Sequence, residues 1–337
     1  MKIRKKLLSF RYSKNFFINK IRASRLKSHF KYVNLSNHNS CPICGCSSGV
    51  LISEVDRVGF QCDTVVCDGC DLVFNNSYIA NAAEFYSRSW GDDRWGDPEE
   101  NFVKRTTSDS YSWKRMAYVA KAIGSKFKNI ESVLEIGCGD GCNLLPYHLV
   151  GKEVTGFDFD DRYLSPGLSR GMNLIQGGLK DMHAAGTYDL AMLIHSFEHM
   201  LDLDSAVTEV SSRLPIGGYV YIEVPGVINW NQPVSNTQQA MGMRSSCNFL
   251  NYLQFQHNYH FDLNHLKHIW ERHGFEMVAG DEWVRCVFLK ATGIDKKDRD
   301  VIPASEKKIF NHLQGVESEF FSLKNFSSSL ARYWSKI

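Results

Sequence analysis

The chain has 337 residues, of which 43% are apolar and 23% are charged, and its formal net charge is +2. These values are typical of a folded globular protein and exclude a disordered chain, and no apolar run reaches the length that crosses a membrane. The length allows one full α/β domain and a smaller module.

Residues 1–40 form a basic arm with 11 of the 39 Lys and Arg residues and no Asp or Glu. The rest of the chain has 28 basic and 37 acidic residues, a formal charge of −9. Apolar side chains are interleaved with the bases, so the arm could lie on an anionic membrane, bind nucleic acid, or be a solvated tail without a specific partner. It lacks the features of a signal peptide, which predicts a cytoplasmic protein, with peripheral contact at the inner membrane surface as one alternative.

Two Cys-x-x-Cys knuckles follow the arm in residues 41–78. Cys41 and Cys44 form the first knuckle, and Cys67 and Cys70 form the second. Two such pairs are typical of a zinc ribbon, in which four thiolates surround a tetrahedral ion. The alternatives are ordinary thiols or a redox pair. With all four positions filled by protein, the predicted zinc is structural and leaves no open position for catalysis.

Residues 79–125 are predicted to hold a linker and a helix. The linker is aromatic and acidic, and its Tyr86 and Trp90 could contact a substrate or pack the cysteine-rich segment onto the rest of the protein. Apolar residues at helical intervals predict a helix over Ser112–Phe127.

A strand predicted at Val133–Ile136 runs directly into a turn that contains Gly137, Gly139 and Gly141. Glycines at these positions let the backbone approach a ligand closely. The next predicted strand ends in Asp158, 19 residues after Gly139, where folds of this kind bind ribose hydroxyls. Asp158 is therefore the expected ribose ligand.

Four motifs in order resemble the class I S-adenosylmethionine-dependent methyltransferases. They are Val-Leu-Glu-Ile-Gly-Cys-Gly-Asp-Gly at 133–141, Val-Thr-Gly-Phe-Asp at 154–158, and the segments 188–199 and 214–225, and the resemblance covers about residues 126–292. It implies an α/β, Rossmann-like, doubly wound sheet of seven strands, followed by a helical tail over 293–337.

The resemblance also implies that S-adenosylmethionine is the cofactor. The loop after the third strand would flank the adenine, with Leu179 as an apolar wall and the polar contact left open. The expected cofactor contacts are Glu135, Gly137, Cys138, Gly139, Gly141, Asp158, Leu179 and His195.

The resembling family carries a Glu-His pair after its fourth strand, here Glu198 and His199. In its sugar methyltransferases the histidine is the general base, so His199 is the candidate base, and Glu198 would orient it or bind substrate. His257 could share the base role or shape the pocket. The alternative is that the pair closes the loop by hydrogen bonding. The remaining histidines of this region, His260, His265, His268 and His273, are expected on the surface of the following helix.

A zinc-binding module joined to a methyltransferase core resembles a group of bacterial sugar methyltransferases. The large C-terminal domain usual in the C-methylating members is not seen in this sequence, which favours O-methylation of a small-molecule or lipid-linked saccharide in surface polysaccharide or glycolipid biosynthesis. The alternatives are a sugar C-methyltransferase, an RNA methyltransferase and a non-catalytic scaffold. No Asn/Asp-Pro-Pro-aromatic motif is present, and the core is net acidic, so nucleic acid is not the expected substrate.

Overall fold

The computed structural model describes residues 1–5, 34–57, 60–81, 84–86, 97–107, 109–184, 186–228, 249–291 and 308–320. Most of the predicted basic arm and Trp90 lie outside these residues. Within them, no helix combines the length and the apolar character needed to cross a membrane.

The larger sheet has seven strands in the order β13-β14-β11-β10-β7-β8-β9. Its five strands from β11 to β9 are parallel, and β14 and β13 are added antiparallel at one edge. This confirms the predicted Rossmann-like sheet, in which ligands bind beyond the carboxyl ends of the parallel strands. The strands are β7 (Ser132–Ile136), β8 (Glu153–Asp158), β9 (Asn173–Gln176), β10 (Leu190–Ile194), β11 (Tyr219–Glu223), β13 (Phe275–Asp281) and β14 (Arg285–Lys290).

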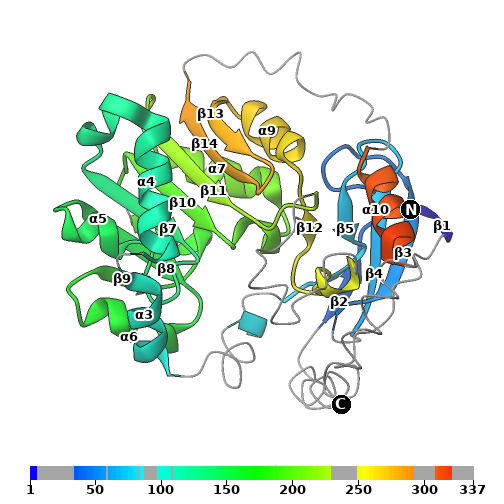
Figure 1. The fold of residues 1–337 in the computed structure, drawn as a ribbon, viewed down its shortest axis with the longest axis horizontal. Coiled ribbons are helices and arrows are strands. Elements are labelled where there is room, and N and C mark those ends of the chain that lie inside the picture. The colour runs from blue at the N-terminus through cyan, green and yellow to red at the C-terminus, as the bar shows by residue number, and fades with distance from the viewer. Residues whose placement is uncertain are drawn as a thin grey trace, which may run out of the picture.

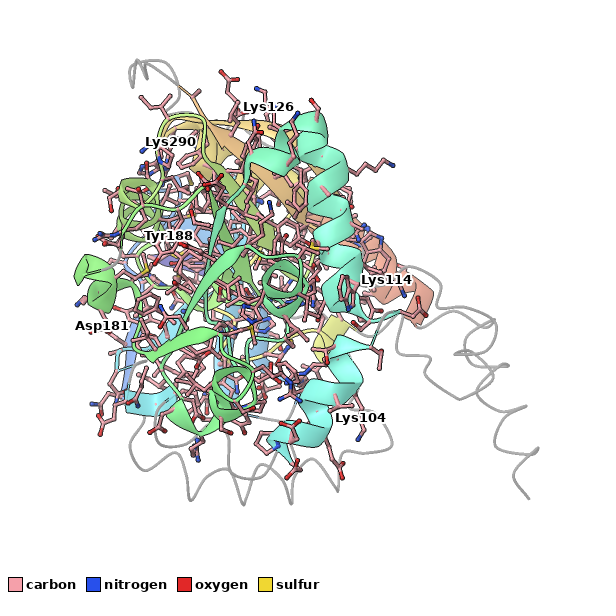
Figure 2. The ribbon with its side chains drawn as sticks, turned by 90° about the vertical axis from the view of Figure 1, so that its left-hand side faces the viewer. Lys104, Lys114, Lys126, Asp181, Tyr188 and Lys290 are labelled. Atoms are coloured by element: carbon pink, nitrogen blue, oxygen red, sulfur yellow. The ribbon has the colours of Figure 1, made fainter. Side chains whose placement is uncertain are left out.

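Helices cover both faces of this sheet because side chains alternate along each strand. Val133 packs on the face covered by α4, and its neighbour Leu134 packs on the opposite face with α7 and α9. Lys114 and Lys126 lie on the outside along α4 and the turn after it (Figure 2). The α-helices are α3 (Pro98–Thr106), α4 (Tyr111–Ile123), α5 (Leu145–Leu149), α6 (Ser165–Leu168), α7 (Leu203–Ser212) and α9 (Leu263–Glu271). The 3₁₀ turns are η2 (Gly124–Asn129), η3 (Asp161–Tyr163), η4 (Leu179–Ala184), η5 (Phe197–His199) and η7 (Phe249–Asn251).

A second sheet, of order β1-β3-β4-β5-β12, carries the two cysteine knuckles, and we call it with its knuckles the cysteine module. Two of its strands cross the predicted domain boundaries, since β1 lies in the predicted arm and β12 in the predicted methyltransferase region. Both pair with the module because a strand at a sheet edge satisfies its backbone groups there. The strands are β1 (Lys2–Lys5), β3 (Ser48–Val55), β4 (Gln61–Cys67), β5 (Val73–Asn75) and β12 (Tyr259–His260), with β2 (Leu35–Asn37) and β6 (Ser77–Ile79) paired separately.

The cysteine module shares one apolar core with the larger sheet. Leu72 and Phe74 of the module belong to the same buried cluster as Trp270 of α9. Figure 1 shows β12 at the edge of the module that faces the larger sheet, and α10 (Lys308–Phe320) against the module. Within the predicted tail, α10 is a helix whose Ile309 and Leu313 are buried.

Two histidines expected at the surface are buried, and that expectation is wrong for them. His260 is 1% exposed and His265 is 3% exposed. The Nε2 atom of His265 lies 3.0 Å from the carbonyl oxygen of Cys70, and its Nδ1 lies 2.7 Å from the Asp262 carboxylate. The cysteine module packs against the face of α9 that carries His265. The pattern of apolar residues along this helix does not predict that contact. His268 and His273 are partly exposed.

Candidate active site

The turn after β7 is held open by three glycines in the left-handed region. Their φ angles are 75° at Gly137, 53° at Gly139 and 80° at Gly141, values that side chains disfavour. A Cβ added at Gly137 would lie 2.8 Å from the Cβ of Ser196. The turn therefore presents backbone where the sequence predicts the cofactor.

Asp158 is the last residue of β8 and lies against this turn. One carboxylate oxygen accepts a hydrogen bond from the backbone N–H of Gly139 at 2.8 Å, and the other accepts one from Asp160 at 3.0 Å. Burial raises the pKa of Asp158, although these backbone donors act in the opposite direction. A carboxylate oriented in this way fits the predicted role of ribose ligand.

Glu135 lies near the end of β7, just before the turn, and Cys138 lies within the turn. Glu135 is fully buried, and burial raises its pKa to about 8. One of its oxygens accepts from the Asn143 amide at 2.8 Å, and the other has no hydrogen-bond partner among the described residues. The side chain of Cys138 is buried, and its backbone N–H donates to the carbonyl oxygen of Phe157 at 3.1 Å.

Leu179 begins η4, directly after the loop that follows β9. This is the position at which the sequence predicts an apolar wall for the adenine. The same loop is folded by a 2.7 Å hydrogen bond from the Gly178 N–H to Asp181. The ring of Phe159 packs directly on Gly178, so closely that a Cβ added at Gly178 would lie 2.4 Å from it. Phe159 is 39% exposed and follows Asp158, so it could add an apolar face for the adenine. Sequence reasoning missed it, although an aromatic residue directly after the ribose acid was a usable signal.

Arg115 of α4 also was not predicted as a site residue. Its guanidinium pairs with Glu223 at the end of β11, with N–O distances of 2.6 and 2.8 Å, and donates to Asn143 at 3.0 Å. Burial raises the pKa of Glu223, but Arg115 and His195 hold it below its usual range. A mostly buried cation near the glycine turn could bind the carboxylate of the cofactor's methionine part. In the sequence, Arg115 is one of several basic residues in the helix before the first strand. Nothing in that pattern distinguishes it from its solvent-facing neighbour Lys114.

His195 follows β10 and has a φ of 51°. Its Nδ1 lies 3.7 Å from Glu198, and its Nε2 lies 3.5 Å from Glu223. Burial lowers the pKa of His195, but the two carboxylates raise it to about 9, which favours the charged imidazole. It lies between the Arg115–Glu223 pair and Glu198, and its charge suits an anionic ligand better than a base role.

The structure brings the three predicted catalytic side chains together. One potential ligand atom from each of Glu198, His199 and His257 lies within 4.8 Å of the others. The Nδ1 atom of His199 lies 2.9 Å from the backbone oxygen of Gln256 and 2.9 Å from the Tyr86 hydroxyl. Because a carbonyl only accepts, the contact with Gln256 favours the tautomer with its proton on Nδ1, whereas the Tyr86 hydroxyl can either accept from Nδ1 or donate to it.

Glu198 lies on the Nε2 side of the His199 ring. It is 1% exposed, and neither oxygen has a hydrogen-bond partner among the described residues. Its distance of 3.9 Å from Nε2 of His199 is too long for a hydrogen bond. Burial and the neighbouring His199 lower the pKa of His257 well below its usual range, so His257 is neutral. A buried carboxylate and two imidazoles of this kind could bind acceptor hydroxyls and could also hold a divalent cation.

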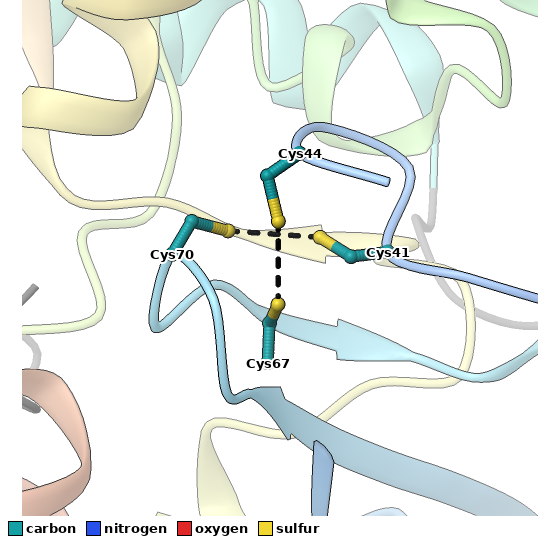
Figure 3. A group of neighbouring side chains, drawn as sticks. All are labelled: Cys41, Cys44, Cys67 and Cys70. Carbon is teal, nitrogen blue, oxygen red and sulfur yellow. Dashed lines mark hydrogen bonds between the residues drawn. The ribbon is translucent and has the colours of Figure 1, made fainter. Parts of the chain in front are cut away.

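The four knuckle cysteines point toward one centre (Figure 3). The sulfur atoms of Cys41 and Cys70 are 3.6 Å apart, and those of Cys44 and Cys67 are 3.5 Å apart. A tetrahedral zinc with bonds of about 2.3 Å would separate its sulfurs by about 3.8 Å. The residues therefore fit the predicted structural zinc.

Comparison with protein families agrees with this geometry. A family model described as a methyltransferase domain matches residues 110–279, about half of the chain. The chain belongs to this methyltransferase family. The fold is that of the class I S-adenosylmethionine-dependent enzymes, so this resemblance is confirmed.

Curated relatives of this methyltransferase include ubiquinone biosynthesis O-methyltransferases from several bacteria. The enzyme from Marinobacter nauticus is 27% identical over 139 residues, which cover 38% of this chain and 56% of the relative. The enzyme from Cronobacter sakazakii is 29% identical over 136 residues, which cover 38% of this chain and 54% of the relative. The chain thus spans about half the length of the curated relatives it matches.

Among solved structures, TehB from Haemophilus influenzae matches with a TM-score of 0.39 and 18% identity over 58% of this chain and 67% of TehB. The amino pentose methyltransferase CalS10 from Micromonospora echinaspora matches with a TM-score of 0.32 and 22% identity over 36% of this chain and 53% of CalS10.

Proposed function

We propose that this methyltransferase transfers a methyl group from S-adenosylmethionine to a saccharide hydroxyl in surface polysaccharide or glycolipid biosynthesis. The observation that supports a hydroxyl acceptor is the fixed ring of His199, whose Nδ1 proton is directed to Gln256. The curated relatives are named O-methyltransferases, which also favours oxygen as the acceptor atom. The saccharide rests on the resemblance of the cysteine module and core together to bacterial sugar methyltransferases.

The residues of this chain divide the work between cofactor and acceptor. When bound, S-adenosylmethionine supplies an activated methyl group on a sulfonium, so the protein mainly aligns the reactants and excludes water. The glycine turn and Asp158 would hold the nucleoside, and Arg115 would hold the carboxylate.

His199 is the proposed general base of the acceptor side. Its Nε2 would accept the proton of the acceptor hydroxyl while Gln256 keeps Nδ1 protonated. Glu198 would bind a neighbouring acceptor hydroxyl and stabilise the imidazolium that forms. His257 is neutral and would shape the pocket or share the proton.

The acceptor is proposed to be a small or lipid-linked saccharide. The basic arm would hold the enzyme near an anionic membrane in which such lipids lie. We propose a peripheral contact of this kind and place no site residue in the arm.

The acceptor class is tested by incubating the purified protein with radiolabelled S-adenosylmethionine and fractionated cell extract. We expect label in glycolipid or nucleotide-sugar fractions. Label in RNA would instead support the RNA methyltransferase, and cofactor binding without transfer to any fraction would support the non-catalytic scaffold.

The role of His199 is tested by His199→Gln, with His148→Ala on α5 as the control. We expect turnover of the labelled acceptor to fall by about 10²- to 10⁴-fold, the usual contribution of a general base, with little change in cofactor affinity measured by calorimetry. Unchanged turnover would remove His199 from the mechanism.

A further inference from the structure

The buried amide of Asn75 links the cysteine module to the acceptor side of the active site. Asn75 ends β5 and is 1% exposed. Its side-chain nitrogen donates to the backbone oxygens of His257 at 2.8 Å and of Gln254 at 3.0 Å, and lies 3.4 Å from that of Phe255. Its own backbone N–H donates to Asn258 at 3.0 Å. One residue of the module therefore binds most of the segment 254–258.

The orientation of this amide follows from its partners. The hydroxyl of Thr64 on β4 lies 3.0 Å from the side-chain oxygen of Asn75. Backbone carbonyls only accept, so the amide nitrogen must face segment 254–258, and the Thr64 hydroxyl must donate to the amide oxygen. The two strands of the module thus fix both ends of the amide.

Segment 254–258 in turn fixes His199. The carbonyl of Gln256, which can only accept, lies 2.9 Å from Nδ1 of His199 and competes there with the Tyr86 hydroxyl, which can also donate. The side chain of Asn258 donates to the backbone oxygen of His199 at 2.7 Å. His257 lies in the same segment, and its ring centroid is 4.9 Å from that of His199. The segment therefore contacts His199 through the Gln256 backbone and the Asn258 side chain, and it carries His257 itself.

We propose that Asn75 is a positioning residue for methyl transfer: through segment 254–258 it fixes the tautomer of His199 and the place of His257. This inference rests on the proposed function, in which the lone pair on Nε2 of His199 takes the acceptor proton. The hydrogen bond at one imidazole nitrogen decides which nitrogen carries the proton. Moving the Gln256 carbonyl would therefore release the proton from Nδ1 and let it occupy Nε2.

The inference gives the cysteine module a role in the active site beyond fold stability. The knuckle Cys67–Cys70 is the connection between β4 and β5, which carry Thr64 and Asn75. An ion bound by the knuckles would hold these two strands in register. The effect of the ion would reach His199 through the Asn75 amide and segment 254–258.

The test compares Thr64→Val, Thr64→Ser and Asn75→Ala in the full chain. Valine has the shape of threonine without the hydroxyl, so it loosens the amide with little change in packing, and serine restores the donor. Asn75→Ala removes the amide. Ser53→Ala on β3 is the matched control, because it removes a buried module hydrogen bond to Val55 that does not contact segment 254–258.

The first readout is the imidazole nitrogen NMR spectrum of protein labelled at histidine, with the His199 signals identified by their loss in His199→Gln. We expect the Nδ1-protonated pattern in the wild type, Thr64→Ser and Ser53→Ala, and a mixture of both tautomers in Thr64→Val and Asn75→Ala. The second readout is turnover of the labelled acceptor, which we expect to fall about tenfold or more in Thr64→Val with cofactor affinity unchanged.

The two readouts separate the inference from the proposed function. If the wild type transfers no methyl group, the proposed function fails, while the NMR spectra still report whether Asn75 positions His199. If Thr64→Val and Asn75→Ala keep the wild-type His199 signals, Asn75 only stabilises the fold and the inference is overturned. Should Asn75→Ala not fold, the decision rests on Thr64→Val against Thr64→Ser.

Discussion

Asp158 is the residue whose predicted role is most directly open to measurement. We expect Asp158→Asn to weaken S-adenosylmethionine binding by about 10- to 100-fold, since hydrogen bonds to a charged group are worth about 1.5–3 kcal/mol. Calorimetric titration with the cofactor measures this. Asp161→Asn, at an exposed carboxylate three residues further on, is the control. Equal affinities of both variants and the wild type would show that Asp158 does not bind the cofactor.

Glu135 should make the stability of the cofactor-free protein depend on pH. Its pKa in the folded state is raised to about 8 by burial, above the value of about 4.3 in an unfolded chain. The folded state therefore holds a proton that the unfolded state releases, so the contribution of Glu135 to stability falls as the pH rises from about 4.3 to about 8.

Glu135→Gln removes this dependence and keeps an oxygen for the Asn143 amide. As the pH rises through this window, we expect the unfolding free energy of the wild type to fall relative to that of Glu135→Gln by up to about 1.4 kcal/mol per pH unit. Urea unfolding at several pH values measures it. Parallel stability curves for the two proteins would contradict a protonated Glu135.

At the scale of residues, the sequence predicted the candidate site residues that belong to local motifs. Glu198 and His199 were found because they follow a strand end in the expected order. Arg115 and Asn75 were missed because each acts on residues far along the chain, at Glu223 and at segment 254–258.

At the scale of elements, the two knuckles are the part whose chemistry the sequence predicted in most detail. We expect the purified protein to contain one zinc per chain, and Cys41→Ser to lose it and unfold at a lower temperature. Metal analysis by mass spectrometry measures the first effect, and thermal unfolding measures the second.

Cys46→Ser is the matched control for this test, because Cys46 lies next to the first knuckle and is not in the four-cysteine cluster. We expect it to retain zinc. A Cys41→Ser variant that still binds one zinc per chain would contradict the assigned ligands, and a disulfide between Cys41 and Cys70 in the purified protein would favour the redox alternative.

At the scale of the whole molecule, α10 and the cysteine module depend on each other although they are far apart in sequence. The N–H of Ile309 at the start of α10 donates to the Asp71 carboxylate at 2.6 Å, directly after the second knuckle. Leu313 is fully buried among module residues such as Ile52 and Val66. These contacts make α10 part of the module's core.

Leu313→Ala should therefore lower the free energy of unfolding by about 2–5 kcal/mol, as for other buried leucines. Ile216→Ala, at a side chain that is 63% exposed, should change it by less than about 0.5 kcal/mol. Urea unfolding measures both. An equally small effect of Leu313→Ala would mean that α10 does not pack on the module in solution.

The sequence by itself determined the glycine turn, the strand that ends in Asp158 and the two knuckles, because each is a local pattern of apolar runs, glycines and reactive side chains. Its resemblance to class I methyltransferases added the seven-stranded sheet and the expected roles of Glu198 and His199. Only the tertiary structure decided that His265 is buried, that β12 pairs with the module and that Asn75 reaches segment 254–258. The physical reason is that these contacts depend on how one sheet packs against another. Such packing pairs backbone N–H and C=O groups, which almost every residue has, so no sequence pattern reveals which of these groups will pair.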